Sequence, residues 1–555
     1  MNRFSTSLDC LKIANINSVF VFMLAIALAT ILFLLKGDIH FNWGDEGHLW
    51  YGVIQTSRGD VPIQDFRSYD PGRYYWAAGW SELLGSGLLS LRISNTLFQV
   101  LGLLLGLLAI NRLITNKYLL FFVGFLLAIW MYPWYKYYEH SLALSAVLFS
   151  LFLIENPSFK RHFISGIFVG VAAFFGRNYG VYFFLTFLSL ILYIWYNVND
   201  ESLLNNLGIW LAGIVVGYSP MLIMLMLIPG FFSSFIDSIL LLFSPGAPVL
   251  PIPIPWLWTL QISFPISLLE LRTVSISFAL TFIPAFYLFS IGYIFMSRKG
   301  PLSPGKQLLI ASVFVGVPLM HHVIVRSGLP HLAQSIHPFL IALIALPFAL
   351  QPKQKRWLVS VVASLVIILT FTIIIPVEAI PIIQKAKAVF LDESTIRVKY
   401  KLVDDSVWIP KHHASYIDLI KQFTKKHIEL GESIFIAPYE PGLYSILGLR
   451  SPTWDPYPLF PVERKRQQDT IQSLERNNVN WALISDKPLD GMDYRRFSKT
   501  HHLVWKYLID NFDTVSLSGL PKDRLLLRRR KKSVGIGPRA NAPNTIDLYR
   551  KNIRM

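Results

Sequence analysis

Long apolar segments fill the first two thirds of the chain. A membrane-spanning helix needs about 20 mostly apolar residues. Segments that reach or approach this length lie at 18–36, 94–111, 117–133, 141–154, 163–176, 179–196, 205–228, 272–297, 306–325, 335–350 and 357–376. The pattern therefore predicts an α-helical polytopic membrane protein with about eleven transmembrane helices, of which the fourth and fifth are the shortest.

After residue 376 the pattern changes to alternating helices and strands. Apolar residues at helical spacing in 411–430 predict a helix, and the short apolar run that follows, 432–437, predicts a strand. Further predicted elements are a helix at 462–477, a strand at 479–485, a helix at 493–511 and one or two strands up to residue 529. This order predicts a soluble α/β domain over 377–530, and the basic segment 531–555 is expected to be a disordered tail.

Composition agrees with a membrane protein and argues against a nucleic-acid partner. The chain is 53% hydrophobic and only 15% charged, whereas soluble domains are about 25% charged. The net charge of +17 comes from the terminal basic segment and from residues that flank apolar runs, where a membrane explains them. The one cysteine, Cys10, excludes an intrachain disulfide.

The distribution of Arg and Lys predicts the orientation in the membrane. With a cytoplasmic N-terminus, nearly every inside loop carries basic residues, as the positive-inside rule requires. The first outside loop, 37–93, and the whole segment after 376 then lie on the extracytoplasmic side. We predict a multi-pass protein of the cytoplasmic (inner) membrane, with residues 1–376 as its transmembrane domain.

Two adjacent carboxylates stand out in the first outside loop. Asp45-Glu46-Gly47 follows the first apolar segment closely, and neighbouring negative charges near a membrane repel each other. Three roles would account for them: general-base catalysis at an acceptor hydroxyl or amine, metal binding, or an aspartate that caps a helix at 47–51. Spacing alone leaves all three open.

The stretch 42–72 resembles the first extracytoplasmic loop of GT-C-type glycosyltransferases, the class of protein O-mannosyltransferases and aminoarabinose transferases. The resemblance rests on Asp45-Glu46-Gly47 after the first span and on Pro62, Pro71 and tyrosines downstream. It covers about 35 residues in motif and the membrane body in topology, and Pro71-Gly72 replaces the family's usual Pro-Pro. It implies an inverting transfer of a hexosyl or pentosyl group from a polyprenyl phosphate, with Asp45 as catalytic carboxylate and Glu46 and Glu139 supporting it.

A lipid-phosphate leaving group develops negative charge, so the outer interface must supply cations. Outside-facing candidates are few in the membrane body, and we predict a donor-phosphate pocket made by two or three of Arg58, Arg67, Arg73, Lys136, Arg177 and Arg326. The resemblance adds Arg326 and His331 as donor contacts. A zinc site around His321, His322, His331 and His337 is disfavoured because the first two are adjacent and no carboxylate lies nearby.

The sequence therefore predicts a membrane glycosyltransferase with a polyprenyl-phosphate sugar donor and a glycan, lipid or protein acceptor. The resemblance implies no certain cofactor and leaves room for a divalent cation. Two alternatives remain: a transporter or flippase of lipid-linked saccharide, and a non-catalytic membrane scaffold. Segments 438–444 and 450–454 of the soluble domain are read as structural turns, or else as an acceptor-recognition surface.

Overall fold

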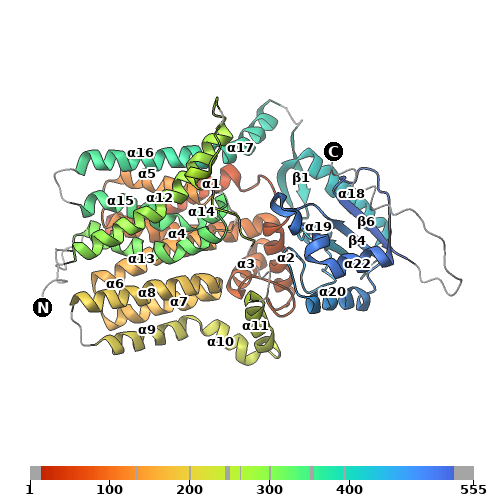
Figure 1. Cartoon of the computed structure of the whole chain (residues 1–555), viewed down its shortest axis with the longest axis horizontal. Helices are drawn as coiled ribbons and strands as arrows, with labels where there is room; N and C mark the ends of the chain where they lie inside the picture. The colour runs from red at the N-terminus through yellow and green to blue at the C-terminus, as the bar shows by residue number, and fades with distance from the viewer. Residues whose placement is uncertain are drawn as a thin grey trace.

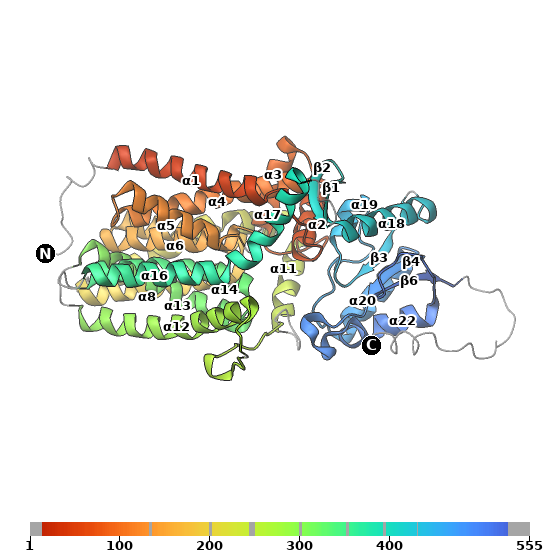
Figure 2. The same cartoon turned by 90° about the horizontal axis from the view of Figure 1, so that it is seen from above.

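The structure is a computed structural model that describes residues 14–132, 136–198, 202–243, 250–262, 264–298, 302–350, 355–391, 396–429 and 431–530. Helices with a common long axis form one part of the molecule, and a smaller part with strands packs against one end of them (Figure 1). The same division is visible from above (Figure 2).

Most helices of the larger part coincide with the predicted apolar segments. Residues 329–334 and 377–390 add helices outside these segments, and 377–390 lies in the range that was predicted for the soluble domain. The helices of the larger part are α1 (Ala14–Lys36), α4 (Leu88–Asn111), α5 (Lys117–Trp130), α6 (Tyr138–Glu155), α7 (Phe159–Phe175), α8 (Arg177–Val198), α9 (Leu203–Gly217), α10 (Ser219–Leu227), α12 (Leu268–Met296), α13 (Pro304–Val325), α14 (Leu329–Ser335), α15 (His337–Ala349), α16 (Lys355–Ile373) and α17 (Ile375–Phe390). The predicted α-helical, multi-pass architecture is confirmed.

Within the described residues, six helices are long and apolar enough to cross a membrane, and the number rises to nine if each bent pair is one span. The bent pairs are α9 with α10, α14 with α15, and α16 with α17, at angles of 57°, 51° and 53°. The other two predicted segments form α5 and α7, which have 14 and 17 residues. The predicted count of about eleven therefore exceeds the number that length and composition support.

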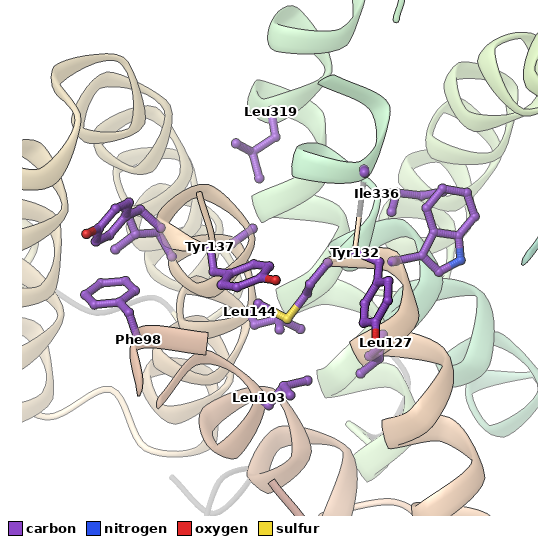
Figure 3. Packing of buried hydrophobic residues seen from close by; sticks show 14 of the residues in the cluster. Phe98, Leu103, Leu127, Tyr132, Tyr137, Leu144, Leu319 and Ile336 are labelled. Atoms are coloured by element: carbon purple, nitrogen blue, oxygen red, sulfur yellow. The ribbon is translucent and has the colours of Figure 1, made fainter. Parts of the chain in front are cut away.

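Small residues and aromatic rings pack these helices together. The backbones of α7 and α9 approach so closely that a Cβ atom on Gly166 would lie 2.1 Å from the Trp210 carbonyl oxygen. Close approach through small residues is a usual way to associate helices in lipid. Elsewhere in the core large side chains pack together: Tyr137 lies next to Leu144 (Figure 3), and the Phe98 ring lies 4.9 Å from the rings of Tyr138 and Phe175.

Three short helices lie at the end of the membrane body that faces the smaller part. Two of them, α2 (Asp45–Ser57) and α3 (Pro71–Leu84), belong to the first outside loop, and α11 (Phe231–Leu240) lies at the same end (Figure 1). The proline-rich residues 250–256 form no helix. The predicted tail 531–555 lies outside the described residues.

The smaller part has the predicted α/β character. Its strands are β1 (Arg397–Leu402), β2 (Asp405–Pro410), β3 (Ile434–Ala437), β4 (Trp481–Ser485), β5 (Phe512–Thr514) and β6 (Arg524–Arg529). Its helices are α18 (Lys411–His427), α19 (Gly442–Leu447), α20 (Arg464–Arg476), α21 (Phe497–Thr500) and α22 (His502–Asn511). A four-stranded sheet has the order β3-β4-β6-β5, in which β3 and β4 are parallel and the other pairs antiparallel.

The separate hairpin of β1 and β2 was not predicted, and it joins the two parts. Strand β2 is hydrogen-bonded to the first outside loop: Trp408 N donates to Asp38 O at 2.7 Å, and His40 N donates to Trp408 O at 2.8 Å. A second junction forms where α2 meets α19: a Cβ atom on Gly47 would lie 2.7 Å from the backbone of Gly442. The smaller part is thus attached to the first outside loop at two places.

The contact between Gly47 and Gly442 leads to a prediction for stability. We expect Gly47→Ala to lower the apparent Tm in detergent, because overpacking two backbones costs about 1–3 kcal/mol. Gly79→Ala in α3 is the matched control: nothing lies within 4 Å of its added Cβ, so helix propensity should leave its Tm equal or slightly higher. Equal Tm values for the two variants would contradict the close junction.

Candidate active site

Asp45 is the first residue of α2, and its side chain does not cap the helix. Gly44 occupies the N-cap position without a side-chain cap. The Asn42 side-chain oxygen accepts hydrogen bonds from the backbone N–H groups of Gly44 and Asp45, each at 3.0 Å. The interpretation of Asp45 as a capping aspartate is therefore wrong. The N–H groups that a capping Asp45 would bind, those of Gly47 and His48, donate instead to the carbonyl oxygens of Asn42 and Gly44.

The Asp45 carboxylate instead contacts a buried cation and a phenol. Its Oδ1 atom lies 3.6 Å from Lys136 Nζ and accepts a hydrogen bond from the Tyr69 hydroxyl at 3.3 Å. Lys136 also donates to the Tyr69 hydroxyl at 2.8 Å. The Lys136 side chain is 4% exposed and that of Asp45 34%. Asp45 thus presents one side to solvent while the other is held by the protein.

The electrostatics of this group follow from burial. Burial lowers the pKa of Lys136, and the negative charge of Asp45 opposes that change. Burial also raises the pKa of Tyr69 well above 10.0, and the neighbouring Asp45 carboxylate raises it further. The tyrosine therefore stays protonated and can donate to the carboxylate.

Glu46 has a different environment from its neighbour. Arg92 Nε donates to Oε1 of Glu46 at 2.7 Å and Arg92 Nη2 donates to Oε2 at 2.9 Å. The same guanidinium donates to the carbonyl oxygens of Gly37 and His40 at 2.8 and 2.7 Å. Both carboxylate oxygens of Glu46 accept hydrogen bonds from Arg92 and the pair is buried, so Glu46 ties the start of α2 to α4.

Glu139 lies at the start of α6 and pairs with Arg73 of α3. Arg73 Nη1 donates to Glu139 Oε1 at 2.6 Å, and Arg73 Nε donates to the Phe175 carbonyl oxygen at 2.7 Å. The guanidinium carbon of Arg73 lies 4.9 Å from the centre of the Tyr69 ring. The second oxygen of Glu139 is buried without a hydrogen-bond partner among the described residues. Glu139, Arg73 and Asp45 thus share the surroundings of Tyr69.

The remaining predicted donor contacts have other partners or lie farther away. Arg177 begins α8 and pairs with Asp70 at 2.8 Å. Arg326 follows α13 and pairs with Asp490 of the smaller part at 3.2 Å. The ring of His331 in α14 lies 4.9 Å from that of His322. Arg58 is exposed beyond the last residue of α2, about 20 Å along the helix axis from Asp45.

The membrane body contains an apolar cavity of about 160 Å³. It is formed by α12, α13, α14 and the segment before η3 (Leu257–Thr259), and it is lined by Ile254, Trp256, Leu280, Ile283, Pro284, Tyr287, Met320, Val323, Ile324, Leu332, Ser335 and Ile336. Two of these residues, Val323 and Ile324, precede Arg326 by three and two positions in the chain. A hydrocarbon chain in the cavity could place a polar head at that arginine.

The smaller part contributes side chains to the same region. The His48 ring lies between Tyr69 at 5.5 Å and Tyr457 at 5.6 Å, measured between ring centres. Arg67 pairs with Asp455 at 2.5 Å, and the Arg67 backbone N–H donates to the Trp454 carbonyl oxygen at 2.8 Å. The segment 451–460 therefore lies directly against the first outside loop.

The histidines between α13 and α15 do not form a metal site of the usual kind. His321 Nδ1 is 2.9 Å from the Tyr182 hydroxyl, and His322 Nε2 is 2.6 Å from the Gln334 side-chain oxygen. Over the described residues, no group of three or more His, Cys, Asp or Glu side chains is arranged to hold a metal ion.

The fold is similar to that of solved membrane enzymes. ArnT from Cupriavidus metallidurans, solved with undecaprenyl phosphate bound, superposes with a TM-score of 0.53 at 13% identity, over 93% of this chain and 99% of that chain. The Archaeoglobus fulgidus oligosaccharyltransferase in its apo form gives a TM-score of 0.46 at 11% identity, over 93% and 75% of the two chains. No family model matches the sequence, and no curated protein matches it. The structural similarity shows that this chain has the GT-C fold.

Several residues of the site were missed in the sequence. Arg92, which lies two residues before the predicted second span, was not counted among the outside cations, although an arginine at a membrane boundary needs a partner. His48 and Tyr69 lie in the first outside loop, and no separate role was predicted for them. Tyr457 gave no signal, because the segment that carries it is more than 350 residues away from Asp45.

The buried pair of Arg92 and Glu46 leads to a second prediction. We expect Arg92→Leu to destabilise the protein by about 3–5 kcal/mol, because it leaves the Glu46 charge buried without its partner. Arg112→Leu is the control: it breaks the pair of Arg112 with Glu155, whose side chains are 46% and 23% exposed, and should cost less than about 1 kcal/mol. Denaturant unfolding in detergent measures both, and equal losses would refute this role of the pair.

His48 leads to a prediction for pH. Burial lowers the pKa of His48 from 6.5 to about 4. Between these values the folded protein binds fewer protons than the unfolded chain, so stability falls as the pH falls from 6.5 to 4, by about 3 kcal/mol in total. His48→Phe keeps an aromatic ring and removes the titration. We expect the Tm of the wild type to fall more steeply than that of the variant between pH 7 and 4.5, and parallel curves would contradict this prediction.

Proposed function

We propose that this protein is a membrane glycosyltransferase that transfers a sugar from a polyprenyl phosphate to an acceptor on the extracytoplasmic side. One observation carries the proposal. Asp45 is partly open to solvent, is held by Lys136 and Tyr69, and lies where the membrane body meets the smaller part. The GT-C fold supports it, since ArnT of the same fold was solved with undecaprenyl phosphate.

The chemistry proposed for Asp45 is that of a general base. The carboxylate accepts the proton of an acceptor hydroxyl or amine, whose oxygen or nitrogen attacks the anomeric carbon. The bond between that carbon and the phosphate oxygen breaks, and the leaving polyprenyl phosphate carries away the electron pair. A single displacement of this kind inverts the anomeric centre. Lys136 and Tyr69 orient the carboxylate.

The leaving phosphate needs cations, and the residues near Asp45 supply them. Arg326 is the favoured donor contact, because it is 24% exposed and closely follows Val323 and Ile324, which line the apolar cavity. That cavity suits part of a prenyl chain. Lys136, Arg177 and His331 are further donor contacts. Arg73 is buried in its pair with Glu139, so we assign both to the support of Tyr69. We leave Arg58 out of the reacting group because it lies far from Asp45 along α2. We leave Glu46 out because it is buried in its pair with Arg92.

The donor follows from the proposed orientation. With the N-terminus in the cytoplasm, α1 brings the chain across the inner membrane to Asp45, so the site lies away from cytoplasmic nucleotide sugars. A sugar attached to a membrane lipid is then the available donor. The scheme needs no metal, since protein cations neutralise the phosphate.

A variant of Asp45 tests the proposal. We expect Asp45→Asn to lower transfer by about 10²–10⁴-fold, the usual contribution of a general base, with unchanged expression and donor binding. The measurement is mass spectrometry of surface glycans and lipid-linked sugars in cells with the wild type, the variant or neither. Asp65→Asn is the control, because Asp65 is an exposed carboxylate of the same loop. Its side chain accepts a hydrogen bond from the nearby backbone N–H of Val61.

The glycan profiles separate the outcomes. Loss of a glycan in Asp45→Asn, with its lipid-linked precursor accumulating, supports the transferase. A glycan profile equal to that of the wild type would show that Asp45 has no catalytic role and would favour a scaffold.

A further inference from the structure

The segment 451–460 of the smaller part is fixed firmly on the first outside loop. Asp455 pairs with Arg67, and the Trp454 indole N–H donates to the carbonyl oxygens of Ile63 and Gln64, both at 3.1 Å. The Ser451 N–H donates to the Tyr51 hydroxyl at 3.1 Å. These bonds join residues almost 400 positions apart in the chain. The segment is therefore an ordered part of the junction between the smaller part and the first outside loop.

These attachments place Tyr457 beside the catalytic carboxylate. Its backbone N–H donates to Asp455 Oδ1 at 2.9 Å, which fixes the turn. Its ring packs on His48 of α2. Its hydroxyl lies against Gly44, the residue directly before Asp45, so that a Cβ atom built on Gly44 would lie 2.4 Å from the hydroxyl oxygen. Gly44 thus leaves the space that this hydroxyl occupies.

Charges from both parts of the protein act on Tyr457. Burial raises the pKa of this phenol well above 10.0, the Asp45 carboxylate raises it further, and Arg326 opposes the change. The phenol therefore stays protonated and can act as both donor and acceptor of hydrogen bonds. The phenol therefore feels the charge of Asp45 and also that of Arg326, which we assign to the donor phosphate.

We propose that Tyr457 binds the acceptor and directs its nucleophilic hydroxyl towards Asp45, so that the smaller part forms one wall of the acceptor site. The inference rests on the proposed function and deepens it. The Tyr457 side chain is half-buried and Asp45 is 34% exposed, so an acceptor can reach both residues from solvent. Tyr457, His48 and Tyr69 bring two phenols and an imidazole together. Such a group of aromatic rings and polar atoms suits a hydroxylated acceptor such as a saccharide.

The test measures how the sugar is divided between the acceptor and water. The purified full-length protein is given the polyprenyl-phosphate sugar extracted from the producing membranes, with delipidated envelope material as acceptor. Transferred and hydrolysed sugar are both counted. We expect Tyr457→Phe to lower the ratio of transfer to hydrolysis about three- to tenfold, the effect of one lost hydrogen bond. A merely structural role would lower both rates together and leave the ratio unchanged.

A second variant displaces the hydroxyl without removing it. The Cβ atom of Gly44→Ala overlaps the Tyr457 oxygen and pushes the end of the ring away, so we expect the same fall in the ratio. In the double variant Gly44→Ala/Tyr457→Phe the overlapping oxygen is absent, and its ratio should equal that of Tyr457→Phe alone. Such non-additivity is typical of residues in direct contact. Additive losses would overturn the proposed contact.

Tyr507→Phe is the control, because it removes a buried hydroxyl in α22 that has no hydrogen-bond partner among the described residues. It should leave the ratio unchanged. A wild-type ratio in Tyr457→Phe would overturn the inference, as would a proportional loss of transfer and hydrolysis. If Asp45→Asn keeps full transfer, the proposed function itself fails, whatever Tyr457 does.

Discussion

The bidentate ion pair between Arg92 and Glu46 is the interaction on which the site depends. It joins the N-terminal turn of α4 to that of α2 and also binds the carbonyl groups that follow α1. Charges buried at a membrane boundary are tolerated only when they are paired in good geometry, so the position of α2 is set by this requirement. Because the pair fixes the start of α2, it also fixes the position of the neighbouring Asp45, whose own carboxylate stays partly exposed to solvent.

The same constraint recurs around Tyr69 and explains how several charges share a small space. Arg73 is neutralised by Glu139, and Lys136 by Asp45, while the Tyr69 ring and hydroxyl separate the pairs. Each cation therefore has a carboxylate within reach. A phosphate that enters this region would compete with these carboxylates for the cations, so binding of the donor and exposure of Asp45 are expected to be coupled.

The smaller part is more than an attachment. The hairpin of β1 and β2 extends onto the segment after α1, α19 packs on α2, and the segment 451–460 covers the other side of the first outside loop. Every one of these contacts is made to the loop that carries Asp45. A change in the smaller part can therefore reach the site without altering the membrane body.

The sequence by itself determined the membrane class, the alternating helices and strands after residue 376, and Asp45 and Lys136 as neighbours of one site. Long apolar runs are stable mainly in lipid, and charges at the outer boundary of a membrane body are rare unless they have a partner or a ligand. The tertiary structure alone decided that Glu46 is occupied by Arg92, that Arg58 lies far from Asp45, and that Tyr457 joins the site. Which charges pair, and which distant segment covers a loop, depends on the packing of helices and domains. Local patterns of hydrophobic and polar residues do not predict that packing.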